Sequence, residues 1–262
     1  MTSSREHLAE HGWLVVRGVV PAARVAELER ALDEVVPPAA YAAWGDGMVE
    51  VAAVSRASAA LRRHATDEAI AAIAAEALGA ERLQLLQDTA LVKPAAHPAR
   101  LAWHQDYSYL AYLDQPRALT VRLALTPCTI ASGCMRVLDG SHRWEHTGEN
   151  LALRRASVED ALAALPAGLR ARVAGAEVAL ELAPGDISLH HCLTFHGSEP
   201  NTSAHPRKTL AVRMFDGACR LVPARLPSPE AAAHFPVDDD GYLAAAAFPV
   251  LWPPARSDTV GS

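Results

Sequence analysis

The alternation of apolar and polar positions predicts a β-rich protein. Between Leu83 and Phe215, short runs rich in Val, Leu, Ile and Thr recur, bounded by Pro, Gly and Asn, as is typical of strands. The expected strands are 83–92, 101–106, 119–126, 178–182, 187–196 and 208–215. A tight turn at Pro184-Gly185-Asp186 should lead into the strand that begins at Ile187.

Three helices are expected beside these strands. They run from Pro21 to just before Pro37, from the N-cap Thr66 to Gly79, and from the N-cap Ser157 to near Pro166. In the first of them, apolar residues recur at three- and four-residue spacing, which gives one apolar face. No internal repeat or low-complexity linker interrupts this pattern.

The order of these elements favours a mainly β fold with flanking helices, built as a double-stranded β-helix, that is, a jelly-roll or cupin-like barrel. We expect a single domain over 1–262 with a barrel core at about 83–216. Segments 36–58 and 143–172 are not accounted for by the barrel and are expected to form a lid that selects the substrate. Trp44 should pack this lid onto the barrel.

Two short motifs carry the candidate chemistry, Trp103-His104-Gln105-Asp106 and Phe195-His196-Gly197-Ser198. If 101–106 is a strand, His104 and Asp106 share a face, about 6.6 Å apart along the backbone. His196 would come from a different strand. Two histidines and one carboxylate form the ligand set of mononuclear non-haem iron(II) oxygenases, and they leave three positions open for a chelating cosubstrate and O2.

Further polar residues are expected around such a site. After the polar loop 197–206, the chain can return beside His196 and place the guanidinium of Arg207 at the pocket floor, where it can bind a carboxylate bidentately. Gln87 and Lys93 share one strand face and could contact cosubstrate or substrate. Arg122 and Arg213 lie in apolar strands, where each could bind an acidic group or be a structural arginine.

From Leu83 to Phe215 the chain resembles the phytanoyl-CoA dioxygenase-like (PhyH) family of iron(II)- and 2-oxoglutarate-dependent oxygenases. The resemblance rests on Lys93-Pro94, Trp103-His104-Gln105-Asp106, Ser132-Gly133-Cys134-Met135, Gly140-Ser141-His142, Pro184-Gly185-Asp186, His196-Gly197-Ser198-Glu199-Pro200-Asn201 and Arg207, and Gly12–Val19 resembles the family's opening strand. It implies that His104, Asp106 and His196 hold iron, while Arg207 and Ser198 bind the distal carboxylate of 2-oxoglutarate. Ser198 could equally be only a turn residue.

The resemblance also implies a reaction. The cofactors would be iron(II), 2-oxoglutarate and O2, and an aliphatic C–H of a small, secondary-metabolite-type substrate would be oxidised with release of succinate and CO2. Hydroxylation, desaturation, epoxidation and ring formation would all use this site. One position departs from the family, because Asp139 stands where Pro usually precedes Gly140.

Two alternatives stay open. A catalytically silent relative would bind metal and 2-oxoglutarate without turnover, although the intact triad and Arg207 argue against it. A zinc-dependent hydrolase could use the same three ligands to hold a metal-bound water. Such hydrolases usually add a general base, and the chain contains no H-E-x-x-H motif.

Composition narrows the partners. The 262 residues carry a net charge of −6 with very little lysine, which gives no basic surface for nucleic acid. No apolar run is long enough to cross a membrane, and the first residues are too polar for a secretory signal. We therefore expect a cytoplasmic enzyme that acts on a small molecule. The sequence does not predict an oligomeric state.

The remaining cysteines and histidines are interpreted as structural. The four cysteines, Cys128, Cys134, Cys192 and Cys219, lack the C-x-x-C spacing of a zinc site and should be free thiols. His142, His190 and His191 are expected to be structural. His190 would lie about 20 Å from His196 if both belonged to one strand, too far to share its metal.

Overall fold

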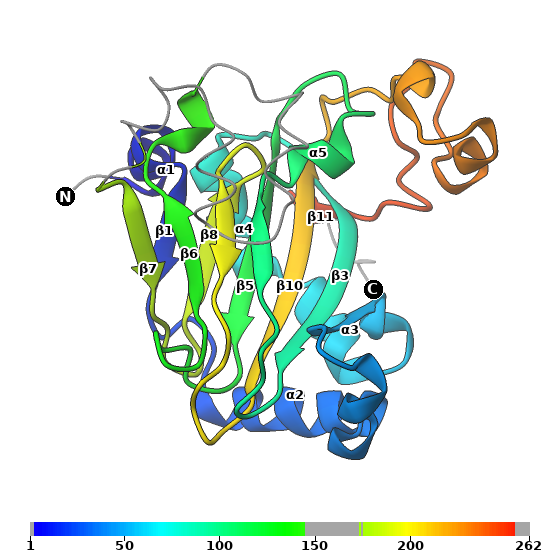
Figure 1. The fold of residues 1–262 in the computed structure, drawn as a ribbon. Coiled ribbons are helices and arrows are strands. Elements are labelled where there is room, and N and C mark those ends of the chain that lie inside the picture. The colour runs from blue at the N-terminus through cyan, green and yellow to red at the C-terminus, as the bar shows by residue number, and fades with distance from the viewer. Residues whose placement is uncertain (1–2, 145–172, 174, 255–262) are drawn as a thin grey trace, which may run out of the picture.

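The computed structural model describes residues 3–144, 173 and 175–254, which form two antiparallel sheets flanked by helices (Figure 1). The larger sheet has seven strands, in the order β1 (Trp13–Val16), β8 (Ile187–His191), β5 (Ala118–Ala124), β10 (Arg207–Asp216), β3 (Leu83–Lys93) and β11 (Val250–Trp252), with β2 (Val49–Ala52) also paired to β3. The smaller sheet has four strands, in the order β4 (Leu101–His104), β9 (His196–Ser198), β6 (Met135–Leu138) and β7 (Glu177–Leu180). The expected β-rich jelly-roll architecture is confirmed.

The helices are α1 (Ser4–His11), α2 (Ala22–Val35), α3 (Ala59–Ala65), α4 (Glu68–Leu78) and α5 (Tyr107–Leu110), with short 3-10 turns η1 (Pro38–Trp44), η2 (Val54–Arg56), η3 (Ser141–Arg143), η5 (Pro223–Arg225) and η6 (Pro229–His234). Helices α2, α3 and α4 bury their apolar faces against one face of the larger sheet, together with Leu210, Val212 and Met214 of β10. The alternate residues of β10 point to the other face. That face looks into the space between the sheets.

The first two expected helices are confirmed as α2 and α4. Helix α4 begins one residue later than expected, because the carboxylate of Asp67 accepts hydrogen bonds from the amides of Ala69 and Ile70. The third, at 157–166, lies outside the described residues. Helix α1 was not expected, although Ser3 and Glu6 form a capping box at its start.

Two expected strands are wrong in their extent. The strand 101–106 ends at His104, and Asp106 already has helical backbone angles at the start of α5. The strand 187–196 is interrupted, because the amide of Thr194 donates to the carbonyl of His191 in a turn that passes from β8 in the larger sheet to β9 in the smaller. The apolar residues of this turn, which sequence patterning cannot distinguish from a strand, are buried in a second apolar cluster.

Several strands lie outside the expected set. β1 corresponds to the opening strand that the family resemblance implied, whereas β6 was not expected. Segment 36–58 contains η1 and also β2, which pairs with β3. Trp44 in this segment is 40% exposed. Thus part of the segment assigned to a lid belongs to the larger sheet.

The four cysteines are free, as expected, and all four are buried. No helix in the described part of the chain has both the length and the apolar character needed to cross a bilayer.

Candidate active site

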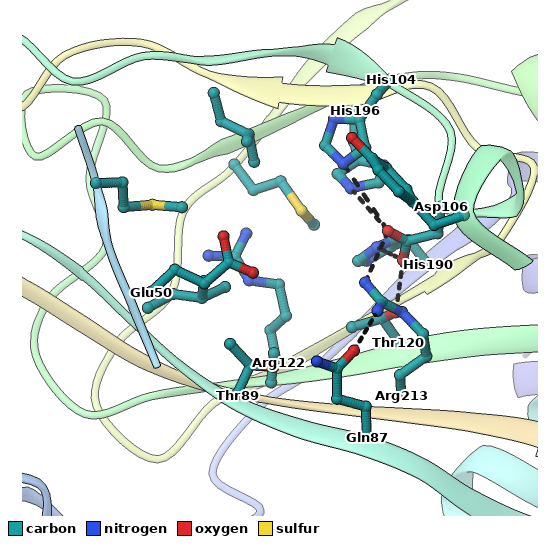
Figure 2. A pocket seen from close by; sticks show the side chains of 16 residues that line it. Glu50, Gln87, Thr89, His104, Asp106, Thr120, Arg122, His190, His196 and Arg213 are labelled. Atoms are coloured by element: carbon teal, nitrogen blue, oxygen red, sulfur yellow. Dashed lines mark hydrogen bonds and ion pairs between the residues drawn. The ribbon is translucent and has the colours of Figure 1, made fainter. Parts of the chain in front are cut away.

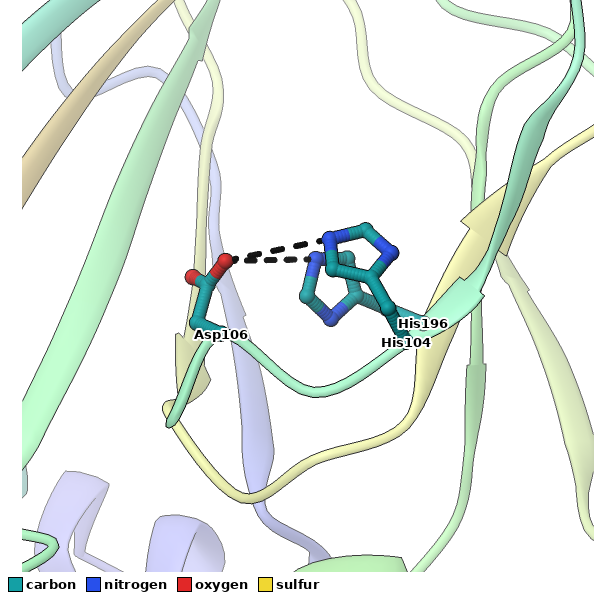
Figure 3. Close-up of side chains that lie close together, drawn as sticks. All are labelled: His104, Asp106 and His196. Carbon is teal, nitrogen blue, oxygen red and sulfur yellow. Dashed lines mark ion pairs between the residues drawn. The ribbon is translucent and has the colours of Figure 1, made fainter. Parts of the chain in front are cut away.

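The side chains of His104, Asp106 and His196 converge between the two sheets (Figure 3). One ligand atom from each lies within 4.8 Å of the others. Oδ1 of Asp106 is 3.8 Å from Nε2 of His104 and 3.9 Å from Nε2 of His196. The fold therefore brings together the three residues that the sequence identified, in a cluster that could hold a metal ion.

The backbone orients both histidines for metal binding. Nδ1 of His104 donates to the carbonyl of Ala102 at 2.8 Å, and Nδ1 of His196 donates to the carbonyl of Thr194 at 3.0 Å. Since a carbonyl can only accept, the proton of each ring is on Nδ1 and the lone pair is on Nε2. Both lone pairs are on the atoms that lie nearest Asp106, as the ligand set of an iron(II) site requires.

Asp106 reaches the cluster by a turn instead of by strand alternation. Antiparallel pairing of β4 with β9 places His104 directly opposite His196. After His104 the chain leaves the sheet, and the amide of Tyr109 donates to the carbonyl of Asp106 in the first turn of α5. The expected proximity of His104 and Asp106 is correct, but its expected cause is wrong.

Three residues of the larger sheet hold the carboxylate of Asp106 (Figure 2). Thr120 donates to Oδ2 at 2.6 Å, and Nε2 of His190 lies 3.2 Å from the same oxygen. Nη2 of Arg213 donates to Oδ1 at 3.0 Å, and its Nη1 donates to Oε1 of Gln87. Strand pairing places Gln87 and Thr120 on either side of Arg213. This row of residues positions the anionic ligand.

These contacts set the charge of the ligands. Burial raises the pKa of Asp106, but Arg213 and the hydrogen bond with His190 outweigh it and hold the pKa well below its usual range. Burial lowers the pKa of His196 well below its usual value, and His104 adds to the effect. At neutral pH the cluster therefore holds a carboxylate and a neutral imidazole, the protonation states in which both bind metals.

His190 was wrongly placed far from the metal ligands. The turn between β8 and β9 brings its ring within 4.2 Å of the ring of His196, measured between centroids, and against Asp106. It is not part of the cluster formed by His104, Asp106 and His196. Its contact with Asp106 was missed because the sequence gave no sign of the turn.

A pocket of about 320 Å³ opens beside the triad. Its polar lining includes Gln87, Thr89, Arg122 and Arg213, and its apolar lining includes Leu91, Leu101, Met135 and Ala211. Met48 and Glu50, from segment 36–58, also line it. The volume suits small ligands.

The other expected cosubstrate residues, Arg207, Ser198 and Lys93, are not among the residues that line this pocket, although Arg207 was expected at its floor. Arg207 is 1% exposed and donates to the carbonyl of Gly133 and to Sδ of Met48, while its Nε has no partner among the described residues. The buried hydroxyl of Ser198 also lacks a partner there. Lys93 is paired across the sheet with Arg207 and donates to the carbonyls of Ser198 and Glu199. Burial, with Arg207 and Arg122 nearby, lowers the pKa of Lys93 to about 6.

Comparison with known proteins gives two kinds of match. The sequence model of the phytanoyl-CoA dioxygenase (PhyH) family matches residues 8–209. A probable alpha-ketoglutarate-dependent hypophosphite dioxygenase of Stutzerimonas stutzeri is 30% identical over 122 residues, which cover 44% of this chain and 39% of that protein. The match thus spans about two fifths of that relative.

Among solved structures, the alpha-ketoglutarate-dependent epimerase SnoN from nogalamycin biosynthesis has a TM-score of 0.72 at 24% identity, over 94% of this chain and 95% of that one. The carbocyclase SnoK from the same biosynthesis has a TM-score of 0.73 at 23% identity, over 94% of each chain. EctD from S. alaskensis, solved with 2-oxoglutarate and 5-hydroxyectoine, has a TM-score of 0.66 at 24% identity, over 82% of this chain and 76% of that one. At these identities the likeness shows a common fold.

Proposed function

Because this chain belongs to the phytanoyl-CoA dioxygenase family, we propose that it is an iron(II)- and 2-oxoglutarate-dependent oxygenase of a small organic substrate. The observation that carries the proposal is the cluster of His104, Asp106 and His196, with both imidazole lone pairs on Nε2. Iron(II) with 2-oxoglutarate and O2 supplies the oxidation of an unactivated C–H bond, with release of succinate and CO2. The protein supplies ligands, orientation and a protected cavity.

The chain's own residues divide this work. His104, Asp106 and His196 would hold iron, and the pocket beside them would take the cosubstrate and the substrate. Thr120, His190 and Arg213 keep the Asp106 carboxylate anionic and fixed in orientation. Apolar residues such as Leu101 and Met135 limit the access of water to the triad.

For the distal carboxylate of 2-oxoglutarate we propose Arg207 and Ser198. Each has a buried polar atom without a partner in the described part of the chain, and a carboxylate would satisfy both atoms. Lys93 holds the carbonyls of Ser198 and Glu199 and thereby positions this wall of the site. Gln87 contributes from the pocket lining through its contact with Arg213.

The pocket favours a small substrate, and we propose hydroxylation or another oxidation of an aliphatic C–H. Its volume of about 320 Å³ lies at the lower end of the range for ligand pockets and must hold cosubstrate and substrate together. The names of two enzymes with this fold indicate different reactions, because SnoN is called an epimerase and SnoK a carbocyclase. The reaction outcome in this family member therefore depends on how the substrate is held.

The test is anaerobic addition of iron(II) and 2-oxoglutarate, which should give a weak visible charge-transfer band that neither component gives alone. His104→Ala and His196→Ala should abolish the band because each removes a ligand. Persistence of the band in both variants would remove the triad assignment.

A second arm separates the alternatives. In air, the iron(II) form should release succinate from 2-oxoglutarate and the zinc form should not. A silent relative would show the band without any succinate release. A zinc hydrolase would show neither, and the proposed function would then be wrong.

A further inference from the structure

Arg122 is a buried cation that faces the pocket without an acidic partner. It lies in β5, is 7% exposed and contributes to the pocket lining. Figure 2 shows its guanidinium on the side of the pocket away from the triad. Among the described residues it makes one hydrogen bond, from Nη2 to the hydroxyl of Thr209 at 3.2 Å, and its Nε has no partner.

Two other arginines whose side chains are at least partly buried are paired with carboxylates, whereas Arg207, assigned above to 2-oxoglutarate, is not. Arg117 contacts Asp216, and Arg213 contacts Asp106. Glu50 also lines the pocket, but it is exposed, and no ion pair within 4 Å joins it to Arg122 in the described residues. A guanidinium stays charged in proteins, and burying it without a counter-charge is strongly unfavourable. The site of Arg122 is therefore suited to an anion that arrives with a ligand.

The proposed cofactors do not supply that anion. Iron(II) and the arginines Arg122, Arg207 and Arg213 would carry five positive charges, whereas Asp106 and the two carboxylates of 2-oxoglutarate would carry three negative charges. Arg122 is then left uncompensated. This count rests on the proposed function, because it assumes that iron and 2-oxoglutarate occupy the site.

Space for an anionic group exists beside Arg122. Its neighbour across the β5–β10 pair is Ala211, whose small side chain also lines the pocket. The apolar residues Leu91, Leu101 and Met135 line the pocket as well, and they suit an aliphatic body attached to the anionic group.

We propose that Arg122 binds an anionic group of the substrate, so that the substrate class is small aliphatic acids carrying a carboxylate or a phosphonate-type oxyanion. The anionic end would lie at Arg122, and an aliphatic carbon would face the triad across the pocket. The guanidinium can donate two parallel hydrogen bonds to such a group, which fixes its direction as well as its position. Arg122 would thus select the substrate and determine which carbon is oxidised.

The experiment measures anion binding by titration calorimetry under anaerobic conditions, with iron(II) and saturating 2-oxoglutarate present. The probes are acetate and methylphosphonate, with acetamide as the uncharged counterpart of acetate. Wild type should bind both anions and bind acetamide at least about tenfold more weakly, a difference of about 1.4 kcal/mol. Arg122→Met should lose the preference for the anion, and Arg122→Lys should restore part of it.

Two comparison variants make the result specific. Arg30→Met removes an exposed arginine on α2 and should bind acetate as wild type does. Arg207→Met should lower the affinity for 2-oxoglutarate, whereas Arg122→Met should change that affinity by less than about threefold. Thermal unfolding of each variant checks that it is folded, and Arg122→Gln replaces Arg122→Met if the latter is not.

Three outcomes would overturn the inference. In the first, wild type with iron(II) and 2-oxoglutarate bound does not bind either anion. In the second, acetate displaces 2-oxoglutarate. In the third, Arg122→Met and Arg207→Met lower the affinity for 2-oxoglutarate equally. The last would make Arg122 part of the cosubstrate site. Failure of the proposed function gives a different result, namely no iron-dependent binding of 2-oxoglutarate to wild type.

Discussion

At the scale of single residues, Asp106 receives the most support of the three proposed metal ligands. Its two oxygens are contacted by a hydroxyl, an imidazole and a guanidinium, all from the larger sheet, whereas each ligand histidine is fixed by one backbone carbonyl of its own segment. The carboxylate is therefore the point at which the two sheets are coupled through the site. Substitution of the residues that contact Asp106 should therefore lower the metal affinity, and any loss of activity should follow from the loss of metal.

We expect Thr120→Val to weaken metal binding by about ten- to a hundredfold, the usual effect of removing a group that orients a ligand. Valine keeps the shape of threonine and removes the hydroxyl that donates to Asp106 at 2.6 Å. Calorimetric titration with manganese(II) measures the effect without turnover. Thr126→Val, which removes a hydroxyl bonded to the carbonyl of Pro206, is the control. Equal manganese affinity in both variants would mean that Thr120 does not orient Asp106.

We expect Arg207→Ala to lower 2-oxoglutarate affinity by about ten- to two-hundredfold, because a lost charge-assisted contact costs roughly 1.5 to 3 kcal/mol. Manganese(II) affinity should hardly change. Titration of the anaerobic charge-transfer band with 2-oxoglutarate gives the number. An unaltered 2-oxoglutarate affinity would place the anchor elsewhere, with Arg122 and Arg213 as the next candidates.

The residues of the site were largely predictable, because metal ligation requires specific side chains in short motifs. His104, Asp106 and His196 were identified from such motifs and lie together. Thr120 was not identified, and the roles of His190 and Arg213 beside Asp106 were missed. Their contacts depend on which strands are neighbours, and β5, β8 and β10 become neighbours only through the tertiary fold.

At the scale of elements, the helices on the outer face of the larger sheet contain a buried histidine. His64 of α3 is 5% exposed, and its Nε2 has no partner among the described residues. Burial lowers the pKa of His64 from 6.5 to about 4, with Asp67 opposing the shift. The imidazole is therefore neutral in the folded protein at pH values where it would be protonated in the unfolded chain.

This difference predicts acid sensitivity of the packing of α3. Because the folded pKa is depressed, the stabilisation is complete above pH 6.5 and is lost as the pH falls from 6.5 towards 4. Between pH 7.5 and pH 5, His64 should account for about 2 kcal/mol of lost unfolding free energy. Urea unfolding at both pH values should therefore show a smaller loss in His64→Leu than in wild type. Exposed His205 provides the control His205→Leu, and equal losses in all three proteins would contradict the assignment.

The elements were predicted well where one side of the chain is buried and less well where the chain changes sheet. β3, β5 and β10 were identified within a few residues because their alternation is regular. The segment 187–196 was interpreted as one strand because the turn within it is as apolar as its flanks. Its burial results from contacts with distant residues, including the carbonyl of Gly12, which composition does not reveal.

At the scale of the whole molecule, residues of both sheets form the site. Binding of the metal and 2-oxoglutarate should therefore stabilise the folded protein. A ligand at a hundred times its Kd adds about 2.7 kcal/mol to the unfolding free energy. For a chain of this size that raises the Tm by roughly 5 to 10 °C. We expect this rise with manganese(II) and 2-oxoglutarate together, and its reversal by a chelator. His196→Ala should show no rise, and a rise of equal size in this variant would mean that the stabilising ligands bind elsewhere.

The arrangement of β10 also has a consequence in time. This strand lies between β3 and β5, and Thr209 bonds to the carbonyl of Leu91 from 118 positions further along the chain. During synthesis, the ribosome has produced β3, β5 and β8 before the strand that joins β3 to β5 exists. Strands that are far apart in the sequence pair slowly, and until β10 is present the edges of β3 and β5 have no partner strand. We therefore expect the larger sheet to remain incomplete on the ribosome until residues near 216 have emerged.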